Sequence, residues 1–239
     1  MIAFARGHLP EAEIHFRAAG NSLEKMKGKA GDCNTRTGRW FRAEILLSRA
    51  QSVLWQGRTI EAEALAREAY KSSRLAKPES MIALSDIYFE QGRFEDSLQV
   101  ALGAIVRLDG LCAPSDSFHR ARSYESAGKA LIGLRRWDEA AETFRKLEKL
   151  LKTDPRTWNL RFRISRDRGI ALLRTGRSNE AWHVFSAVAH EHIQRLGEDN
   201  YLSMEAKVFM ALAMVDIGDY PKALSILREV IPTMLDLWR

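Results

Sequence analysis

The sequence has few cysteines, few prolines and no long apolar run. The two cysteines, Cys33 and Cys112, lie 79 residues apart without metal-ligand spacing, so we expect free thiols in a reducing compartment. No apolar stretch approaches the roughly 18 residues that a membrane-spanning helix needs. The N-terminus, MIAFARGHLPEAE, is too short and too polar for a signal peptide. With only six prolines and no low-complexity tract, the composition is that of a folded cytoplasmic protein.

Sequence motifs that carry catalysis are also absent. There is no Gly-x-Ser-x-Gly, no P-loop, no Gly-x-Gly-x-x-Gly after a strand, and no strand pattern. Of His183, His190 and His192, only the first two share a helical face, which favours incidental histidines on a surface helix over a metal site. A formal charge of +6 is mild for 239 residues and does not by itself imply nucleic acid. We therefore expect no catalytic residue, no metal and no cofactor.

What the sequence has in abundance is one short motif, seen most clearly as QGRFEDS at 91–97. Variants of this motif recur at 4–13, 55–64, 133–142, 174–183 and 216–225. The small residues that end the motifs follow one another at spacings of 50, 35, 43, 41 and 42, and they are Ala12, Ala62, Ser97, Ala140, Ala181 and Ala223. Such periods are typical of stacked helix pairs, in which each motif is the turn between two helices.

Small residues also recur twelve positions before each of the last five motif ends, at Ala50, Ser85, Gly128, Gly169 and Ala211. We expect the two helices of a pair to cross where both carry a small side chain, because their backbones can then approach closely. Four residues after each motif end comes an apolar position, and another follows three residues later. This spacing predicts that one face of every second helix is buried.

The pattern resembles the tetratricopeptide repeat (TPR), whose unit is about 34 residues. It matches best at Ser85, Gly92, Ser97, Ala101 and Ala104. The later units, of about 42 residues, resemble the kinesin-light-chain-like and bacterial signalling variants. The resemblance implies an all-α fold: a right-handed α-solenoid of stacked antiparallel helix pairs, with about 11 helices. One departure is the third complete turn, which has Arg135 where the others have glycine.

The repeats predict a single domain over 1–239. We expect a half repeat at 1–27 and complete repeats at about 39–75, 79–108, 117–152, 156–195 and 200–238. The first unit lacks its leading helix, and the last predicted helix carries several apolar residues, Val230, Ile231, Met234, Leu235, Leu237 and Trp238. Repeat arrays need a polar outer face at their ends. We therefore expect a fragment of a longer protein, or a last helix that pairs with another domain or chain.

In the family that the sequence resembles, the first helix of each pair lines a concave groove. The matching positions here are Glu44, Leu47, Gln51, Glu79, Ile82, Asp86, Arg122, Glu125, Lys129, Arg163, Arg166, Ile170, Glu205, Val208 and Leu212. The predicted groove is acidic early, basic in the middle and apolar late. From it we select the partner-binding candidates Gln51, Asp86, Arg122, Glu125, Lys129, Asn159, Arg163 and Arg166.

The densest charge lies at 156–168, with five arginines and one acid. Arg156, Asn159, Arg163 and Arg166 fall within about 80° of one another on a helix. Two interpretations stay open: a solvated face, or a groove for an acidic segment, since guanidinium groups pair bidentately with carboxylates. Nucleic acid is disfavoured, because Glu44, Glu79 and Asp86 would repel a long phosphate backbone.

Phrases such as LLRTGRSNEAWHVF and ALSILREVIPTML resemble the helical repeats found upstream of caspase-like CHAT peptidase domains in bacteria. Two function classes follow. The first is a non-catalytic scaffold that binds a protein or peptide, within a larger bacterial signalling or CHAT-protease protein. The second is a ligand-sensing regulatory domain, of the peptide-pheromone or transcription-activator type, that changes conformation when it binds a small effector.

Overall fold

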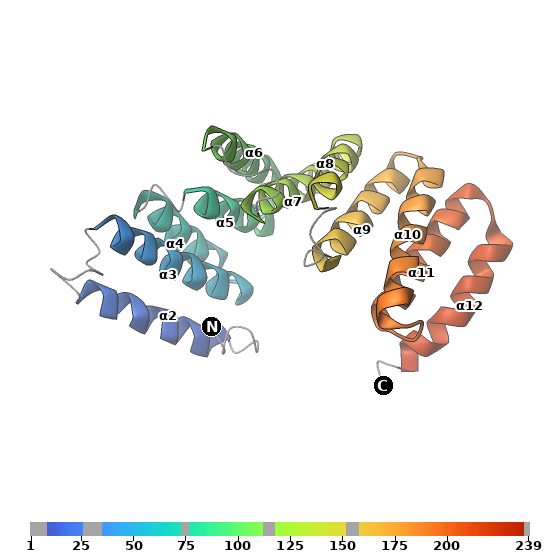
Figure 1. Cartoon of the computed structure of the whole chain (residues 1–239), viewed down its shortest axis with the longest axis horizontal. Helices are drawn as coiled ribbons and strands as arrows, with labels where there is room; N and C mark the ends of the chain where they lie inside the picture. Colours follow the sequence, from blue (N-terminus) through green and yellow to red (C-terminus); the bar gives the residue numbers. More distant parts are fainter. Residues whose placement is uncertain (1–8, 26–34, 73–76, 112–117, 152–157, 237–239) are drawn as a thin grey trace. The chain divides into compact units, whose positions relative to one another are not determined.

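The computed structural model describes residues 9–25, 35–72, 77–111, 118–151 and 158–236. Every regular element in these ranges is an α-helix, eleven in all, labelled α2 to α12 in Figure 1. The all-α solenoid fold with about 11 helices is thus confirmed. The chain divides into two compact units, Met1–Leu134 and Arg135–Arg239, which are described separately below. A single domain over 1–239 stays a prediction.

The first unit holds six helices: α2 (Leu9–Glu24), α3 (Arg36–Trp55), α4 (Thr59–Ser72), α5 (Lys77–Glu90), α6 (Phe94–Gly110) and α7 (Phe118–Gly133). Each helix packs against the next one in the chain. In addition, α5 contacts both α3 and α7, so the first helices of successive pairs form one layer. This layer is the face that the family resemblance assigns to the groove.

The second unit holds five helices: α8 (Trp137–Leu151), α9 (Trp158–Arg174), α10 (Ser178–Leu196), α11 (Tyr201–Ile217) and α12 (Tyr220–Asp236). Here too each helix packs against the next, and the first helices α9 and α11 also contact each other. The predicted repeat at 117–152 has its first helix in one unit and its second helix in the other. In both units the predicted helix ends lie within about one turn of the observed ends.

The turns between paired helices share one backbone geometry. Four of them place a glycine at positive φ: Gly57, Gly92, Gly176 and Gly218. The amide that follows the glycine donates to the carbonyl five residues earlier, from Arg58 to Val53, Arg93 to Tyr88, Arg177 to Leu172 and Asp219 to Met214. This is the Schellman helix ending, which glycine adopts without steric cost. Arg135 takes the same left-handed conformation, with φ of 58°, despite its side chain.

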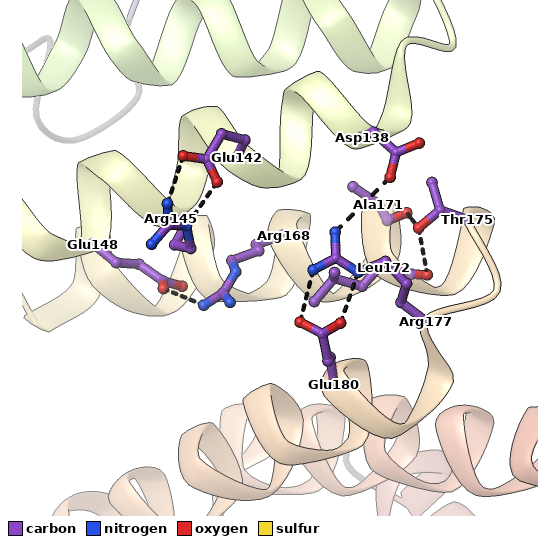
Figure 2. Close-up of polar contacts among 10 residues, drawn as sticks. All are labelled: Asp138, Glu142, Arg145, Glu148, Arg168, Ala171, Leu172, Thr175, Arg177 and Glu180. Atoms are coloured by element: carbon purple, nitrogen blue, oxygen red, sulfur yellow. Dashed lines mark hydrogen bonds and ion pairs between the residues drawn. The ribbon is translucent and has the colours of Figure 1, made fainter.

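In three of these turns an arginine follows the glycine, and it explains why the motif also contains acids. Its guanidinium lies between two carboxylates. One belongs to the first turn of the helix that follows the arginine, and the other belongs to the second helix of the preceding pair. The triplets are Glu13–Arg58–Glu61, Glu63–Arg93–Asp96 and Asp138–Arg177–Glu180. Figure 2 shows the third, in which Arg177 bonds Glu180 at 2.7 Å and approaches Asp138 at 3.8 Å. The motif therefore joins one repeat to the next.

The small residues meet as predicted wherever both lie in one unit. Ser85 and Ser97 are buried, with their hydroxyl oxygens 3.0 Å apart, and each hydroxyl also donates to the other residue's carbonyl. Ala50 and Ala62 are buried in the same way. At Gly169 a Cβ atom would lie 2.3 Å from the ring of Phe185, so this position has room only for glycine. Close helix crossings thus position the first helices.

Several predictions fall outside the described residues. These concern Cys33, Cys112, Arg156, Leu237 and Trp238. Gly197 directly follows the last residue of α10, Leu196, and has φ of 89°.

Candidate functional site

The layer formed by α3, α5 and α7 in the first unit contains a cavity of about 320 Å³. Seven of the predicted groove positions line it: Glu44, Leu47, Gln51, Glu79, Ile82, Asp86 and Arg122. Three of these, Gln51, Asp86 and Arg122, are among the selected candidates. The seven positions come from three separate helices, and the structure brings together what the family resemblance assigned to one groove.

The cavity also has an apolar wall, which the sequence did not indicate in full. Leu47, Ile82 and Ala83 come from the first helices, while Phe16 comes from α2 and Phe118 from the start of α7. The Phe118 side chain is 65% exposed. Phe16 is one of the apolar positions four residues after a motif end, and Phe118 is the first residue of α7. Their place in the cavity depends on tertiary packing, so the periodicity carried no signal for it.

One side of the cavity is a chain of charged groups. Arg122 donates to Asp86 at 2.6 Å and contacts Glu125 at 3.2 Å, while Lys129 contacts Glu125 at 3.0 Å. Ser126 donates to the second oxygen of Asp86 at 2.8 Å. Burial raises the pKa of Asp86, and the Arg122 charge opposes that rise.

Glu125 has a different role from the one its groove position suggested. Its side chain is only 2% exposed, and its carboxylate is held by Arg122 and Lys129. A carboxylate in that position orients the two cations. It is not accessible to a partner in the way that Gln51 and Arg122 are. A first-helix position therefore does not guarantee contact with the groove.

The other side of the cavity carries Glu44, Glu79 and His119. His119 Nε2 lies 3.1 Å from Glu79 Oε1. Glu79 Oε2 is buried and has no hydrogen-bond partner among the described residues. Burial raises the pKa of Glu44, and the neighbouring Glu79 charge raises it further, whereas His119 lowers it. Negative charge is thus concentrated here with little to balance it.

The first-helix face of the second unit, on α9 and α11, is a different surface. Arg166 lies 3.3 Å from Asp167 and 3.8 Å from Glu205, which is itself a predicted groove position. Arg163 is exposed, and so is Leu212, at 44%. Asn159 belongs to α9, but its side chain lies outside the described part of the chain.

Other arginines of the 156–168 segment point to neighbouring helices. Arg161 donates to Glu191 of α10 at 3.0 Å, and Arg168 donates to Glu148 of α8 at 2.6 Å. Figure 2 shows the second pair between α8 and α9. Ser165 donates to the other oxygen of Glu148 at 2.8 Å. Carboxylates of adjacent helices therefore offset much of the positive charge that the sequence suggested.

A smaller cavity of about 160 Å³ lies among α8, α9 and α10, bordered by Phe162 and His192. The expectation that His192 is an incidental surface residue is wrong, since it is 1% exposed with its ring centroid 3.9 Å from that of Phe162. Phe162 packs against Val188, Ala189 and Ala206, as its predicted place on the packing face requires.

Within the described ranges, no set of three or more His, Cys, Asp or Glu residues is arranged to hold a metal ion. The same ranges contain no helix with the length and apolar character needed to cross a membrane.

Comparison with known proteins agrees with the repeat architecture. Residues 47–110 match the family described as Tetratricopeptide repeat, a range that runs from α3 to the end of α6. Comparison with curated proteins gave no match to the sequence. The matched range thus includes the turn motifs at 55–64 and 91–97.

The fold is similar to that of several solved structures. BtubC (BKLC) from P. vanneervenii has a TM-score of 0.80 at 12% identity, with 96% of this chain and 92% of that chain covered. The TPR-like repeats of a putative kinesin light chain from Podosopora anserina give 0.73 at 15% identity, covering 83% and 97%. The apo form of RapI gives 0.68 at 14% identity, covering 80% and 69%. At these identities the similarity establishes the fold alone.

Proposed function

We propose that this protein is a non-catalytic scaffold that binds a segment of a partner protein on the first-helix layer of its first unit. The observation that carries this proposal is the cavity of about 320 Å³ whose lining residues come from α2, α3, α5 and α7. Cavities that combine an apolar wall with a few converging polar groups are typical of binding sites. The tetratricopeptide match at 47–110, which includes α3 and α5, supports the same face.

The contacts of the polar groups favour binding over chemistry. Asp86 is held by Arg122 and Ser126, and Glu125 by Arg122 and Lys129. Carboxylates fixed in this way are suited to hold neighbouring side chains in place. A general base, in contrast, needs access to the proton that it removes.

For the second unit, the proposal includes the binding of an acidic segment of a partner protein. There Arg163 and Arg166 lie on the first helix α9, in the place that the family resemblance assigns to a groove. The ion pairs of Arg166 with Asp167 and Glu205 make this surface the weaker of the two, because an incoming carboxylate must displace them.

The same proposal places the chain in the bacterial cytoplasm, as the recognition part of a larger signalling or CHAT-protease protein. A ligand-sensing domain is the second candidate. The cavity favours it, because its size and its unbalanced carboxylates suit a small effector as well as one side chain of a peptide. A ligand-dependent change in small-angle X-ray scattering would distinguish sensing from simple docking.

The proposal can be tested by selecting binders from a displayed library of random dodecapeptides on the immobilised protein. Selected peptides are then measured against Phe118→Ala, which removes an exposed ring from the cavity wall. We expect this change to weaken binding about tenfold. Leu102→Ala is the matched control, since Leu102 is 43% exposed on α6 and does not line the cavity.

A library that yields no binder would overturn the scaffold function. Binders that respond equally to Phe118→Ala and Leu102→Ala would overturn the location of the site.

A further inference from the structure

We infer that the cavity of the first unit selects a lysine or arginine side chain of the bound segment, with Glu44 and Glu79 as the receiving carboxylates. This inference rests on the proposed function and adds the charge of the ligand to it. It also differs from the acidic partner expected for the arginines of α9. Three features of the cavity support it: its charge balance, a carboxylate oxygen of Glu79 without a donor, and its apolar wall.

The ionisable groups that line the cavity are Glu44, Glu79, Asp86, His119 and Arg122. Among the lining residues that the structure describes, Arg122 is the one permanent cation, and it is committed to Asp86 at 2.6 Å and to Glu125 at 3.2 Å. Glu44 and Glu79 are left to share His119. The cavity therefore has an excess of negative charge on the side formed by α3 and the start of α5.

The two oxygens of the Glu79 carboxylate differ in their contacts. Oε1 lies 3.1 Å from His119 Nε2, whereas Oε2 is buried and has no hydrogen-bond partner among the described residues. A buried carboxylate oxygen without a donor costs free energy, and a ligand that brings a donor recovers it. Burial raises the pKa of Glu44, and the charge of the neighbouring Glu79 raises it further, so a negative charge on Glu44 carries an unfavourable free energy in the cavity. A cation placed between them relieves both penalties.

The apolar wall suits the stem that carries such a cation. Leu47, Ile82 and Ala83 lie beside Glu44 and Glu79 on α3 and α5. Long basic side chains bury their methylene groups along apolar surface while the charged end reaches polar groups. The exposed ring of Phe118 at the rim adds an aromatic face on which a guanidinium or ammonium can stack.

Other occupants fit less well. An anion would meet Glu44 and Glu79 without a free cation to receive it. A bare metal ion lacks a ligand set, since no group of three or more suitable side chains is arranged for one within the described ranges. The combination of carboxylates and apolar wall is complementary to a basic residue flanked by apolar ones in a peptide.

The test uses the random dodecapeptide library on the full chain and reads both the sequences and the affinities. We expect selected peptides to share one lysine or arginine next to an apolar residue. Replacing that basic residue with norleucine, or combining Glu44→Gln with Glu79→Gln in the protein, should each weaken binding at least tenfold. The two losses should not add, because both remove the same contact.

Glu95→Gln is the matched control, because Glu95 is an exposed carboxylate on α6. It should change affinity less than twofold. Unchanged thermal unfolding of the double glutamine variant shows that its fold is intact. Glu44→Gln alone serves if the double variant is unstable, because Glu44 forms no hydrogen bond with the described residues of the cavity. Selected peptides without a shared basic residue, or full affinity for the glutamine variants, would overturn the inference while leaving the scaffold in place. A library without any binder would overturn both.

Discussion

The first-helix faces of the two units differ in how their charges are balanced. On α3, α5 and α7 the cations Arg122 and Lys129 are committed to Asp86 and Glu125, and negative charge remains at Glu44 and Glu79. On α9, Arg166 is met by Asp167 and Glu205. In the sequence, the densest positive charge lies at 156–168. The structure teaches that the charge left unpaired after helices pack is the better guide to a binding surface.

The largest contrast should appear when one arginine is removed from each face. Arg122→Ala leaves Asp86 without its guanidinium partner and removes one of the two cations that hold the buried Glu125, so we expect a loss of about 3 kcal/mol in the free energy of unfolding. Arg166→Ala removes ion pairs at longer distances and should cost less than about 1 kcal/mol. Urea unfolding measures both. Equal losses would mean that the two networks do not differ in burial.

A second contrast concerns the packing of glycines. Gly169→Ala in the second unit places a methyl group 2.3 Å from the Phe185 ring, which is itself fully buried, and should cost about 2 kcal/mol. Gly103→Ala in the first unit meets only the flexible end of Met81, at 2.8 Å. Its cost should stay below about 1 kcal/mol. Thermal unfolding compares the two variants, and a reversed order would contradict the close crossing of α9 and α10.

The turn at Arg135 can be compared with the glycine turns. Because Arg135 has φ of 58°, Arg135→Gly should stabilise the protein by about 0.5–1 kcal/mol, whereas Gly92→Ala, at φ of 73°, should destabilise it by about 1 kcal/mol. No atom lies within 4 Å of a Cβ at Gly92, so backbone strain alone decides the second result. Differential scanning calorimetry measures both. A destabilised Arg135→Gly would show that the arginine side chain has a structural role.

The smallest expected effect is on stability at low pH, where the carboxylates of Glu13 and Glu180 should contribute differently. Despite desolvation, hydrogen bonds and the charges of Arg58 and Arg17 hold the pKa of Glu13 below its usual value, and Arg177 does the same for Glu180. A lowered folded pKa adds stability above the unfolded value of about 4.5, and that stability is lost as the pH falls through the folded value. Glu13→Gln should therefore flatten the acid side of the stability profile.

Glu180→Gln should flatten the same profile less, because its carboxylate is 52% exposed where that of Glu13 is 9% exposed. Melting temperatures measured between neutral pH and about pH 3 test this order. A profile that is unchanged in Glu13→Gln would contradict the role of the Glu13–Arg58–Glu61 triplet.

Much of the architecture could be predicted because it is encoded locally. Most turn motifs contain a glycine, an arginine and an acid close together, and the small residues recur at a fixed distance from them. The positions on α3 and α5 that the family resemblance assigns to a groove, such as Leu47 and Ile82, line one cavity, and their role in binding stays a prediction.

The rest of the site depends on contacts between residues far apart in the sequence. Phe16 reaches the cavity from α2, and Arg168 is neutralised by Glu148 of another helix. The burial of Glu125 and His192 is likewise decided by how neighbouring helices pack. No periodic pattern carries this information. The sequence therefore overstated the positive charge at 156–168. It also predicted only that the groove is acidic early, where the structure has an acidic cavity.

The central claim is that a partner segment binds on α3, α5 and α7. Hydrogen–deuterium exchange of the full chain, with and without a selected basic peptide, tests this most directly. We predict slower exchange in α3, α5 and the start of α7, no change in α9 and α11, and loss of the protection in the Glu44→Gln, Glu79→Gln variant. Protection confined to α9 and α11, or protection that persists in that variant, would contradict the account.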